Sequence, residues 1–260
     1  MDNYFWDTQI EYLKTTRTQM WNDDYFKFLV RSVWKFDKPL NIIDFGCGYG
    51  YLGLKLLPLL PEGSTYTGLD MGEALLCEAR RIYEKSPYKT HFINVDLTRF
   101  VPRQQYDIAI CQAVLRHIPS SKDILQKMID SVLPDGMVIC IEVNRDMEES
   151  GFYTDLIEHD TPEKMARLKQ QWNDELHNGG RDYKLGIKVP IYMQQLGLKD
   201  VGVRINDFVE LVSPLSGECD YIHQMDSLMK SKGIISANNE KGFAINARCL
   251  VISYGIKCAE

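Results

Sequence analysis

The sequence lacks any long apolar segment and any leader. No run of apolar residues approaches the roughly 18 that a membrane-spanning helix requires. The first residues do not show a basic stretch followed by an apolar one. We therefore expect a protein that neither crosses a membrane nor carries a signal peptide. Over its 260 residues the chain is 45% hydrophobic and 25% charged, which predicts one globular domain covering residues 1–260.

Paired cysteines are also absent. The seven cysteines are an odd number, they include no Cys-x-x-Cys pair, and several of them lie within apolar runs. Disulfide-bonded and zinc-binding proteins usually show regular cysteine spacing. We therefore expect reduced, buried thiols, no metal site and a cytoplasmic location.

The chain has no excess of positive charge. It contains 30 Lys and Arg residues against 36 Asp and Glu residues, a formal net charge of −6. Proteins that bind nucleic acid through its phosphates depend on clustered cations, so this balance disfavours a general nucleic-acid binder.

An alternation of strands and helices begins near Leu40. Short apolar runs predict strands at 41–45, 65–69, 91–95, 106–111 and 137–143, and helical patterns lie at 52–60, 72–84 and 121–132. This alternation predicts an α/β fold with a doubly wound, mostly parallel sheet and helices on both faces.

The two ends of the chain depart from this rhythm. Residues 1–38 have the pattern of aromatic-rich helices, which we interpret as an N-terminal helical lid. Residues 145–195 show helical patterns and no convincing strand, and we interpret them as a helical cap over the carboxyl ends of the strands. Two late strands at 201–212 and 243–254, separated by a helix near 221–230, are expected to close the sheet with an antiparallel edge.

The most informative stretch is the turn after the first expected strand, from Asp44 to Gly50. Glycines are needed where a turn between strand and helix adopts positive φ and lets a ligand touch the backbone. The helix that follows directs its free N–H groups toward the same point. Gly48, Gly50 and Gly53 also match the pattern G-x-G-x-x-G, so a dinucleotide site has to be weighed.

Three acids flank this turn at the ends of successive strands. Asp44 closes the first strand, Asp70 ends the second, and Asp96 ends the third. A carboxylate at the second strand end can accept hydrogen bonds from both ribose hydroxyls. One at the third can accept a hydrogen bond from an adenine amino group. Together the acids favour a cationic nucleoside without phosphates over a pyrophosphate-bearing dinucleotide.

At these residues the sequence resembles the class I S-adenosylmethionine-dependent methyltransferases, and within them an uncharacterised small-molecule-type group. The resemblance runs from about Asn22 to Tyr254 and is strongest in 44–50, 65–70, 94–97 and 106–111. It implies a Rossmann-like methyltransferase fold with an antiparallel last strand, S-adenosylmethionine as cosubstrate, and 145–195 as the acceptor region.

The resemblance also assigns roles around the cosubstrate. Gly46 and its neighbours would meet the methionine end, Asp70 the ribose and Asp96 with Leu97 the adenine, while Tyr25 would lie over the methionine end. The residues expected to bind the cosubstrate are Tyr25, Asp44, Gly46, Cys47, Gly48, Gly50, Asp70, Met71, Asp96, Leu97, Cys111 and Gln112.

Little catalytic machinery is expected, because methyl transfer from a sulfonium is an in-line displacement from an activated donor. A base is required only if the acceptor loses a proton. His117 is the best-placed titratable group and the candidate catalytic residue, although relatives often use a histidine here for packing.

Aromatic residues raise two further expectations. Tyr4, Phe5, Trp6, Trp21 and Tyr25 could line the lid or pack the first helices against the sheet. In the cap, aromatic side chains could shape an acceptor pocket; they are Tyr153, Trp172, Tyr183 and Tyr192.

The expected function is therefore methyl transfer from S-adenosylmethionine to O, N or C of a small molecule. No Asn/Asp-Pro-Pro-aromatic sequence follows Cys111, where Gln112-Ala113-Val114 stands, which argues against methylation of a base in nucleic acid. Two alternatives stay open at this point. One is an NAD(P)-dependent oxidoreductase, and the other is a non-catalytic module that binds S-adenosylmethionine.

Overall fold

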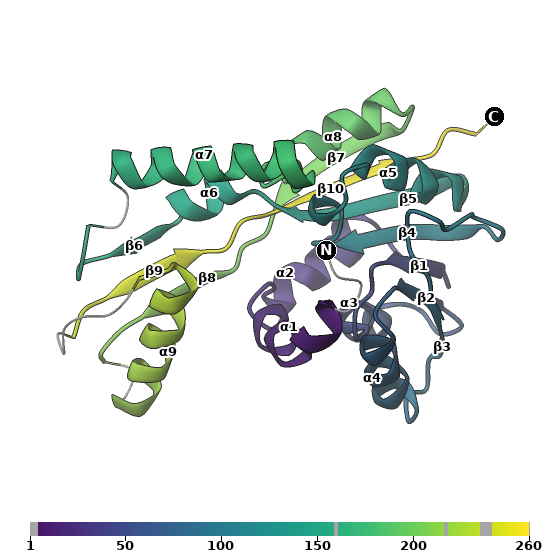
Figure 1. Cartoon of the computed structure of the whole chain (residues 1–260). Coiled ribbons are helices and arrows are strands. Elements are labelled where there is room, and N and C mark those ends of the chain that lie inside the picture. The colour runs from purple at the N-terminus through teal and green to yellow at the C-terminus, as the bar shows by residue number, and fades with distance from the viewer. Residues whose placement is uncertain (1–4, 159–160, 216–217, 235–240, 260) are drawn as a thin grey trace.

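The computed structural model describes residues 5–158, 161–215, 218–234 and 241–259, so Tyr4 lies outside the described residues. A seven-stranded sheet forms the centre, in the order β3-β2-β1-β4-β5-β10-β7 (Figure 1). Its strands are β1 (Asn41–Phe45), β2 (Thr65–Asp70), β3 (Lys89–Asn94), β4 (Tyr106–Gln112), β5 (Val132–Val143), β7 (Lys199–Ile205) and β10 (Leu250–Ile256).

Alternate residues of these strands face two separate apolar layers. Ile42 packs with the N-terminal helices, α3 (Tyr51–Leu56) and α4 (Glu73–Tyr83), whereas Ile43 packs with α5 (Ser121–Asp130) and α8 (Leu185–Gln195). The period-2 alternation of side chains along a strand explains why neighbours point to opposite faces. The predicted α/β fold, with helices on both sides of the sheet, is confirmed.

The strand directions confirm a mostly parallel sheet with an antiparallel last strand. β1 pairs in parallel with β2 and β4, and β4 pairs in parallel with β5. β10 is antiparallel to both β5 and β7. The antiparallel strand β10 therefore lies between β5 and β7. The edge strand of the sheet is β7, whereas we expected an antiparallel strand at this edge.

A second, three-stranded sheet was not predicted. It contains β6 (Phe152–Thr154), β9 (Ala244–Ala247) and β8 (Val209–Val212), and α9 (Glu218–Ser231) packs against it. The expectation of no strand within 145–195 is therefore wrong. Figure 1 shows this sheet beside the large one, linked to it by the two chain segments that run through both sheets.

Each of the two late strands that the sequence predicts breaks into two. The segment 201–212 divides into β7 and β8, and 243–254 divides into β9 and β10. At the break, Asn206 Oδ1 accepts a hydrogen bond from Leu250 N at 2.8 Å, and Asn206 Nδ2 donates to Met20 O at 3.1 Å. Asn206 N also donates to Leu250 O at 3.1 Å, so a buried side-chain amide supplements the backbone hydrogen bonds where the strands pass from one sheet to the other.

The N-terminal segment is built into the core of the domain. It contains η1 (Trp6–Gln9), α1 (Ile10–Arg17), α2 (Asp23–Phe28) and the π-helix η2 (Leu29–Val33). Its Trp21 and Phe26 are buried, and Trp21 Nε1 donates to Gln112 Oε1 at 3.4 Å. For Trp21 the packing alternative is the one observed.

The region after β5 is mainly helical, with α6 (Arg145–Ser150), α7 (Pro162–Gly179) and α8. As Thr161-Pro162 predicts, Thr161 Oγ1 caps α7 by accepting from Lys164 N, and Gly180 ends the helix with φ +69°. Trp172 is buried and stacks on Tyr183, with 5.8 Å between ring centroids. Among the described helices, none has the length and apolar character to span a membrane.

Candidate functional site

The glycine turn after β1 forms one wall of the site. Gly46 has φ +77° and Gly48 has φ +55°, conformations that favour glycine. A Cβ on Gly46 would lie 2.5 Å from a methyl group of Val114, whereas nothing lies within 4 Å of a Cβ position on Gly48. Gly46 is therefore required by packing, and Gly48 leaves open space beside the backbone.

Asp70 at the end of β2 is fixed by the backbone of two turns. Its Oδ2 accepts from Gly48 N at 2.8 Å, and its Oδ1 accepts from Gly72 N at 2.9 Å. Burial raises the pKa of Asp70, and the two N–H donors oppose that shift. Each oxygen retains lone-pair capacity for further donors such as hydroxyl groups.

Asp44 at the end of β1 has a different environment. It is fully buried, its Oδ2 accepts from the Tyr66 hydroxyl, and its Oδ1 has no hydrogen-bond partner among the described residues. Burial raises the pKa of Asp44 to about 7, although the Tyr66 hydrogen bond and the positive charge of Arg17 oppose the shift. A buried oxygen without a donor is costly, so a ligand that supplies one is favoured here.

Asp96 follows β3 and forms a turn with Thr98. Its Oδ1 accepts from the backbone N and the hydroxyl of Thr98 at 2.8 Å and 2.7 Å. The next residue, Leu97, is buried. This turn presents one carboxylate oxygen and one apolar side chain side by side, which suits a flat ring with an amino group.

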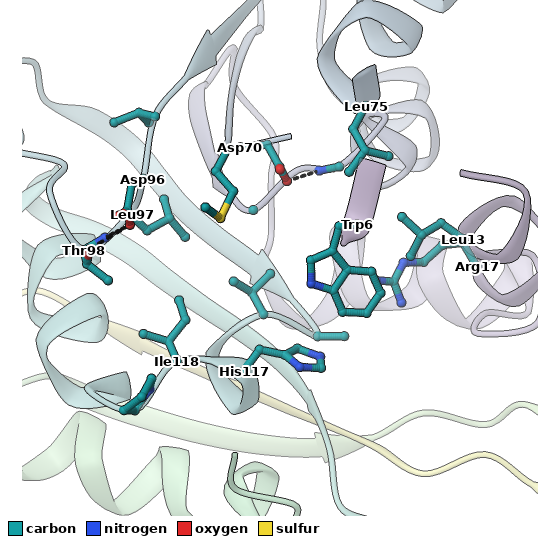
Figure 2. Close-up of a pocket in the computed structure, with 17 residues that line it drawn as sticks. Trp6, Leu13, Arg17, Asp70, Leu75, Asp96, Leu97, Thr98, His117 and Ile118 are labelled. Atoms are coloured by element: carbon teal, nitrogen blue, oxygen red, sulfur yellow. Dashed lines mark hydrogen bonds between the residues drawn. The ribbon is translucent and has the colours of Figure 1, made fainter. Parts of the chain in front are cut away.

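A cavity of about 250 Å³ brings most of the expected residues together. The expected residues that line it are Gly46, Gly48, Asp70, Met71, Asp96, Leu97 and His117. An adjoining hollow is lined by Asp44, Cys47 and Gln112, and it shares Gly46, Gly48, Leu13 and Arg17 with the cavity. Figure 2 shows Asp70, Asp96 and His117 arranged around the cavity, with Trp6 beside His117.

Three expected residues do not line the cavity or its hollow. Tyr25 points elsewhere and donates its hydroxyl proton to Ile205 O at 2.7 Å. Gly50 caps α3 with φ +82°, and Cys111 is fully buried on the opposite face of the sheet, opposite Cys140 of β5. The alternation of β4 explains the position of Cys111, because its side chain points away from the glycine turn.

His117 ends a 3-10 turn, η4 (Leu115–His117), after β4. Its Nε2 lies 3.0 Å from Arg116 Nε, so it accepts that proton, and its ring contacts Trp6 with 5.1 Å between centroids. Burial and then the neighbouring arginines, Arg116 first, lower the pKa of His117 to about 3. The imidazole is therefore neutral at neutral pH, and its Nδ1 is a buried donor without a partner among the described residues.

Arg17 and Glu142 also belong to the site, and neither was among the residues expected from the sequence. Arg17 lines both the cavity and the hollow one helical turn after Leu13, which lines them too. Glu142 Oε1 accepts from Val114 N and Leu115 N at 2.9 Å and 2.8 Å and so holds the turn that carries His117. For Arg17, the available sequence signal was its i, i+4 spacing from Leu13, which places both on one helix face. For Glu142, the signal was a charged residue inside an apolar strand.

Comparisons with known proteins show the family of the chain. A family model described as a methyltransferase domain matches residues 36–184. The chain is 31% identical over 143 residues to a ubiquinone biosynthesis O-methyltransferase of Yersinia enterocolitica, covering 54% of this chain and 56% of that protein. The chain spans only 30% to 56% of the length of the curated relatives that it matches.

Two solved structures share the fold. The plantazolicin methyltransferase BpumL, in complex with SAH, is 19% identical, with a TM-score of 0.53, 98% of this chain covered and 88% of that one. Phosphoethanolamine N-methyltransferase 2 of Haemonchus contortus, in complex with S-adenosyl-L-methionine, is 12% identical, with a TM-score of 0.57 and coverages of 91% and 53%.

Proposed function

Because the chain belongs to the methyltransferase domain family, we propose that it transfers the methyl group of S-adenosylmethionine to a small molecule. The observation that carries this proposal is the row of buried or half-buried acids around the cavity and its adjoining hollow. Asp44, Asp70 and Asp96 come from the ends of three neighbouring strands, in the order methionine, ribose and adenine. A cationic nucleoside without phosphates is the ligand class that such a row matches electrostatically.

The methionine end would meet a matched pair of charges. The adjoining hollow contains the Arg17 guanidinium, which suits the ligand's carboxylate, and Asp44, whose unpartnered Oδ1 suits its ammonium. Asp70 would accept the ribose hydroxyls, and Asp96 with Leu97 would hold the adenine. Met71 and the glycine-turn residues Gly46, Cys47 and Gly48 would provide the remaining walls.

The methyl transfer itself requires few catalytic groups from the protein, because the sulfonium is already an activated donor. A lone pair of the acceptor forms a bond to the methyl carbon while the carbon–sulfur bond breaks, and its electrons return to sulfur to give S-adenosylhomocysteine. If the accepting atom carries a proton, that proton passes to water. The protein contributes alignment and exclusion of water, for which the enclosed cavity between the strand ends and Trp6 is suited.

For His117 we propose a role as hydrogen-bond donor to the acceptor rather than as general base. A conjugate acid with a pKa of about 3 belongs to a weak base, and its Nε2 lone pair already accepts from Arg116. Its Nδ1–H is the group left to bind a substrate atom. The ring proton is assigned to Nδ1 because Nε2 has to be unprotonated to accept the hydrogen bond from Arg116.

The oxidoreductase alternative has little to support it. Gly53, the third glycine of the G-x-G-x-x-G match, is buried in α3, where a Cβ would lie 2.5 Å from the Tyr83 hydroxyl oxygen. The same Cβ would lie 2.9 Å from the Tyr66 ring of β2, so close packing of helix and strand explains this glycine, and both kinds of site can require it. The buried Asp44 would face a pyrophosphate with like charge.

A small-molecule acceptor and a cytoplasmic location belong to the same proposal. The absence of the Asn/Asp-Pro-Pro-aromatic sequence after β4 and the net charge of −6 speak against a nucleic-acid acceptor. Among the described cysteines, Cys47, Cys111, Cys140 and Cys249 are buried free thiols, as expected in a reducing compartment.

Calorimetry with S-adenosylhomocysteine and with NAD tests the cosubstrate directly. We expect binding of S-adenosylhomocysteine and none of NAD; the reverse result overturns the proposal. Incubation with methyl-labelled S-adenosylmethionine and a metabolite extract then tests catalysis. Binding without any label transfer would favour a non-catalytic module instead.

A further inference from the structure

A second hollow adjoins the cavity on the far side of Trp6 and His117, which line both. It has a volume of about 240 Å³, and we call it the arginine basin, after Arg116, Arg145 and Arg181 in its lining. Its other walls are mainly aromatic, and the described lining contains no Asp or Glu. In a chain with a net charge of −6, this concentration of cations is unexpected.

Arg116 is the central cation of the basin. Its Nε donates to His117 Nε2 at 3.0 Å, and among the described residues no carboxylate oxygen lies within 4 Å of it. Burial, with repulsion from Arg145, lowers the pKa of Arg116, and the charges of Glu142 and Glu148, which do not line the basin, oppose that shift. Because buried charges are normally paired, a largely buried guanidinium without a carboxylate is a site that an anion stabilises.

The other two arginines contact carboxylates that lie outside the lining, and Arg181 also contacts Tyr183, which is part of it. Arg145 Nη1 contacts Glu148 Oε2 at 2.6 Å, and Arg181 Nη1 lies 3.5 Å from Glu175 Oε2 and 3.4 Å from the Tyr183 hydroxyl. These contacts fix the two side chains in the wall of the basin. The Arg145 guanidinium has five N–H donors, so its one carboxylate contact does not saturate it.

A neighbouring hollow along α7 provides the contrast. It also borders on His117 and contains Arg181 and Arg167, but Asp174 and Glu175 line it as well. Its formal charges therefore balance, whereas those in the lining of the arginine basin all have the same sign. Of the two hollows that meet at His117, only the basin selects by charge.

We propose that the methyl acceptor is an anion, a molecule whose carboxylate or phosphate group binds Arg116, Arg145 and Arg181 while its accepting atom reaches past Trp6 and His117 into the cavity. This inference rests on the proposed function and adds the substrate class to it. The aromatic walls, Trp6, Tyr12 and Tyr183 among them, favour an acceptor with a ring.

The test uses the full chain loaded with S-adenosylhomocysteine, so that Arg17 is already occupied. Three probes share one ring: 4-hydroxybenzoate, 4-hydroxyphenyl phosphate and the neutral 4-hydroxybenzamide. Calorimetry should show at least one charged probe binding about tenfold or more tightly than the amide, with affinity falling as salt rises. The stronger of the two charged probes distinguishes a carboxylate acceptor from a phosphorylated one.

Variants connect the preference to the basin. Arg116→Gln and Arg145→Gln should each weaken binding of the preferred anion about tenfold and leave the amide unaffected. Arg167→Gln, in the charge-balanced hollow, is the matched control and should change neither affinity by more than about twofold. If Arg116→Gln does not fold, Arg145→Gln and the wild-type probe series still decide the matter.

Two failures are distinguishable. If S-adenosylhomocysteine does not bind, the proposed function fails before any probe is added. If it binds but the three probes bind equally, or none binds, the arginine basin is not an anion site and this inference is overturned.

Discussion

The cavity at the strand ends and the arginine basin meet at Trp6 and His117, yet their charges are opposite. The cavity lining contains Asp70 and Asp96, whereas the lining of the basin contains three arginines and no described acid. A sulfonium cosubstrate and an anionic acceptor would each match the side on which it binds. Under the proposal, this difference in charge would help to orient the two reactants about the wall between them.

The two sides also differ in how their charged groups are held. Backbone N–H groups of the glycine turn and the β2–α4 turn fix Asp70, so the parallel sheet itself positions the acid. Side-chain contacts hold the basin arginines, which come from η4, α6 and the segment after α7. Under the proposal, the sheet would therefore position the cosubstrate, and the added segments would select the acceptor.

The largest effect should follow from removing the acid that the sheet positions most firmly. Asp70→Ala deletes the acceptor of two backbone N–H groups and, under the proposal, of the ribose hydroxyls. We expect S-adenosylhomocysteine binding to weaken by about 1–3 kcal/mol in calorimetry. Asp107→Ala is the control: Asp107 accepts a hydrogen bond from Asn41 N at the start of β1, away from the cavity. Unchanged affinity in Asp70→Ala would show that the ribose binds elsewhere.

The next effect depends on pH. The pKa of Asp44 is about 7 without ligand, and the ligand's ammonium group should favour its ionised form. Binding then requires loss of the proton below pH 7, so S-adenosylhomocysteine affinity should fall about tenfold between pH 8 and pH 6. Asp44→Asn should bind more weakly with a flat profile. An equal pH dependence in Asp44→Asn would assign the titration to another group, such as Asp70.

The large sheet could be predicted from the sequence because local signals agree with its tertiary structure. The apolar run Asn41–Phe45 ends at a glycine turn, and the same strand–turn–helix pattern recurs through β5. The acids at the strand ends could be placed for the same reason. Parallel strands bring their carboxyl ends to one edge, so three positions distant in sequence share one cavity.

The small sheet and the basin could not be predicted in this way. In the strand-like run 201–212 only the pair Asn206-Asp207 is a turn signal, and the break there depends on contacts with Leu250 and Met20. Likewise, Arg116, Arg145 and Arg181 are single arginines in three segments, and only tertiary packing brings them together. Long-range contacts of this kind leave no periodic pattern in the sequence.

A smaller effect should separate the methionine end from the nucleoside end. Arg17→Gln removes the cation proposed for the ligand's carboxylate, so S-adenosylhomocysteine should bind about 1 kcal/mol more weakly. 5′-Methylthioadenosine has no amino-acid portion, and its affinity should stay within about twofold of the wild-type value. If both ligands weakened equally, Arg17 would act on the shape of the cavity rather than on the carboxylate.

The smallest effect on binding is expected at Tyr25, which the family resemblance assigns to the methionine end but whose hydroxyl donates to Ile205 O of β7. Tyr25→Phe should leave S-adenosylhomocysteine affinity unchanged within about twofold. Loss of the hydrogen bond should lower the free energy of unfolding by about 0.5–1.5 kcal/mol in denaturant titration. A tenfold loss of affinity would instead show that Tyr25 leaves Ile205 and closes over the ligand. The N-terminal segment would then act as a lid, and the cavity would differ from the basin in mobility as well as in charge.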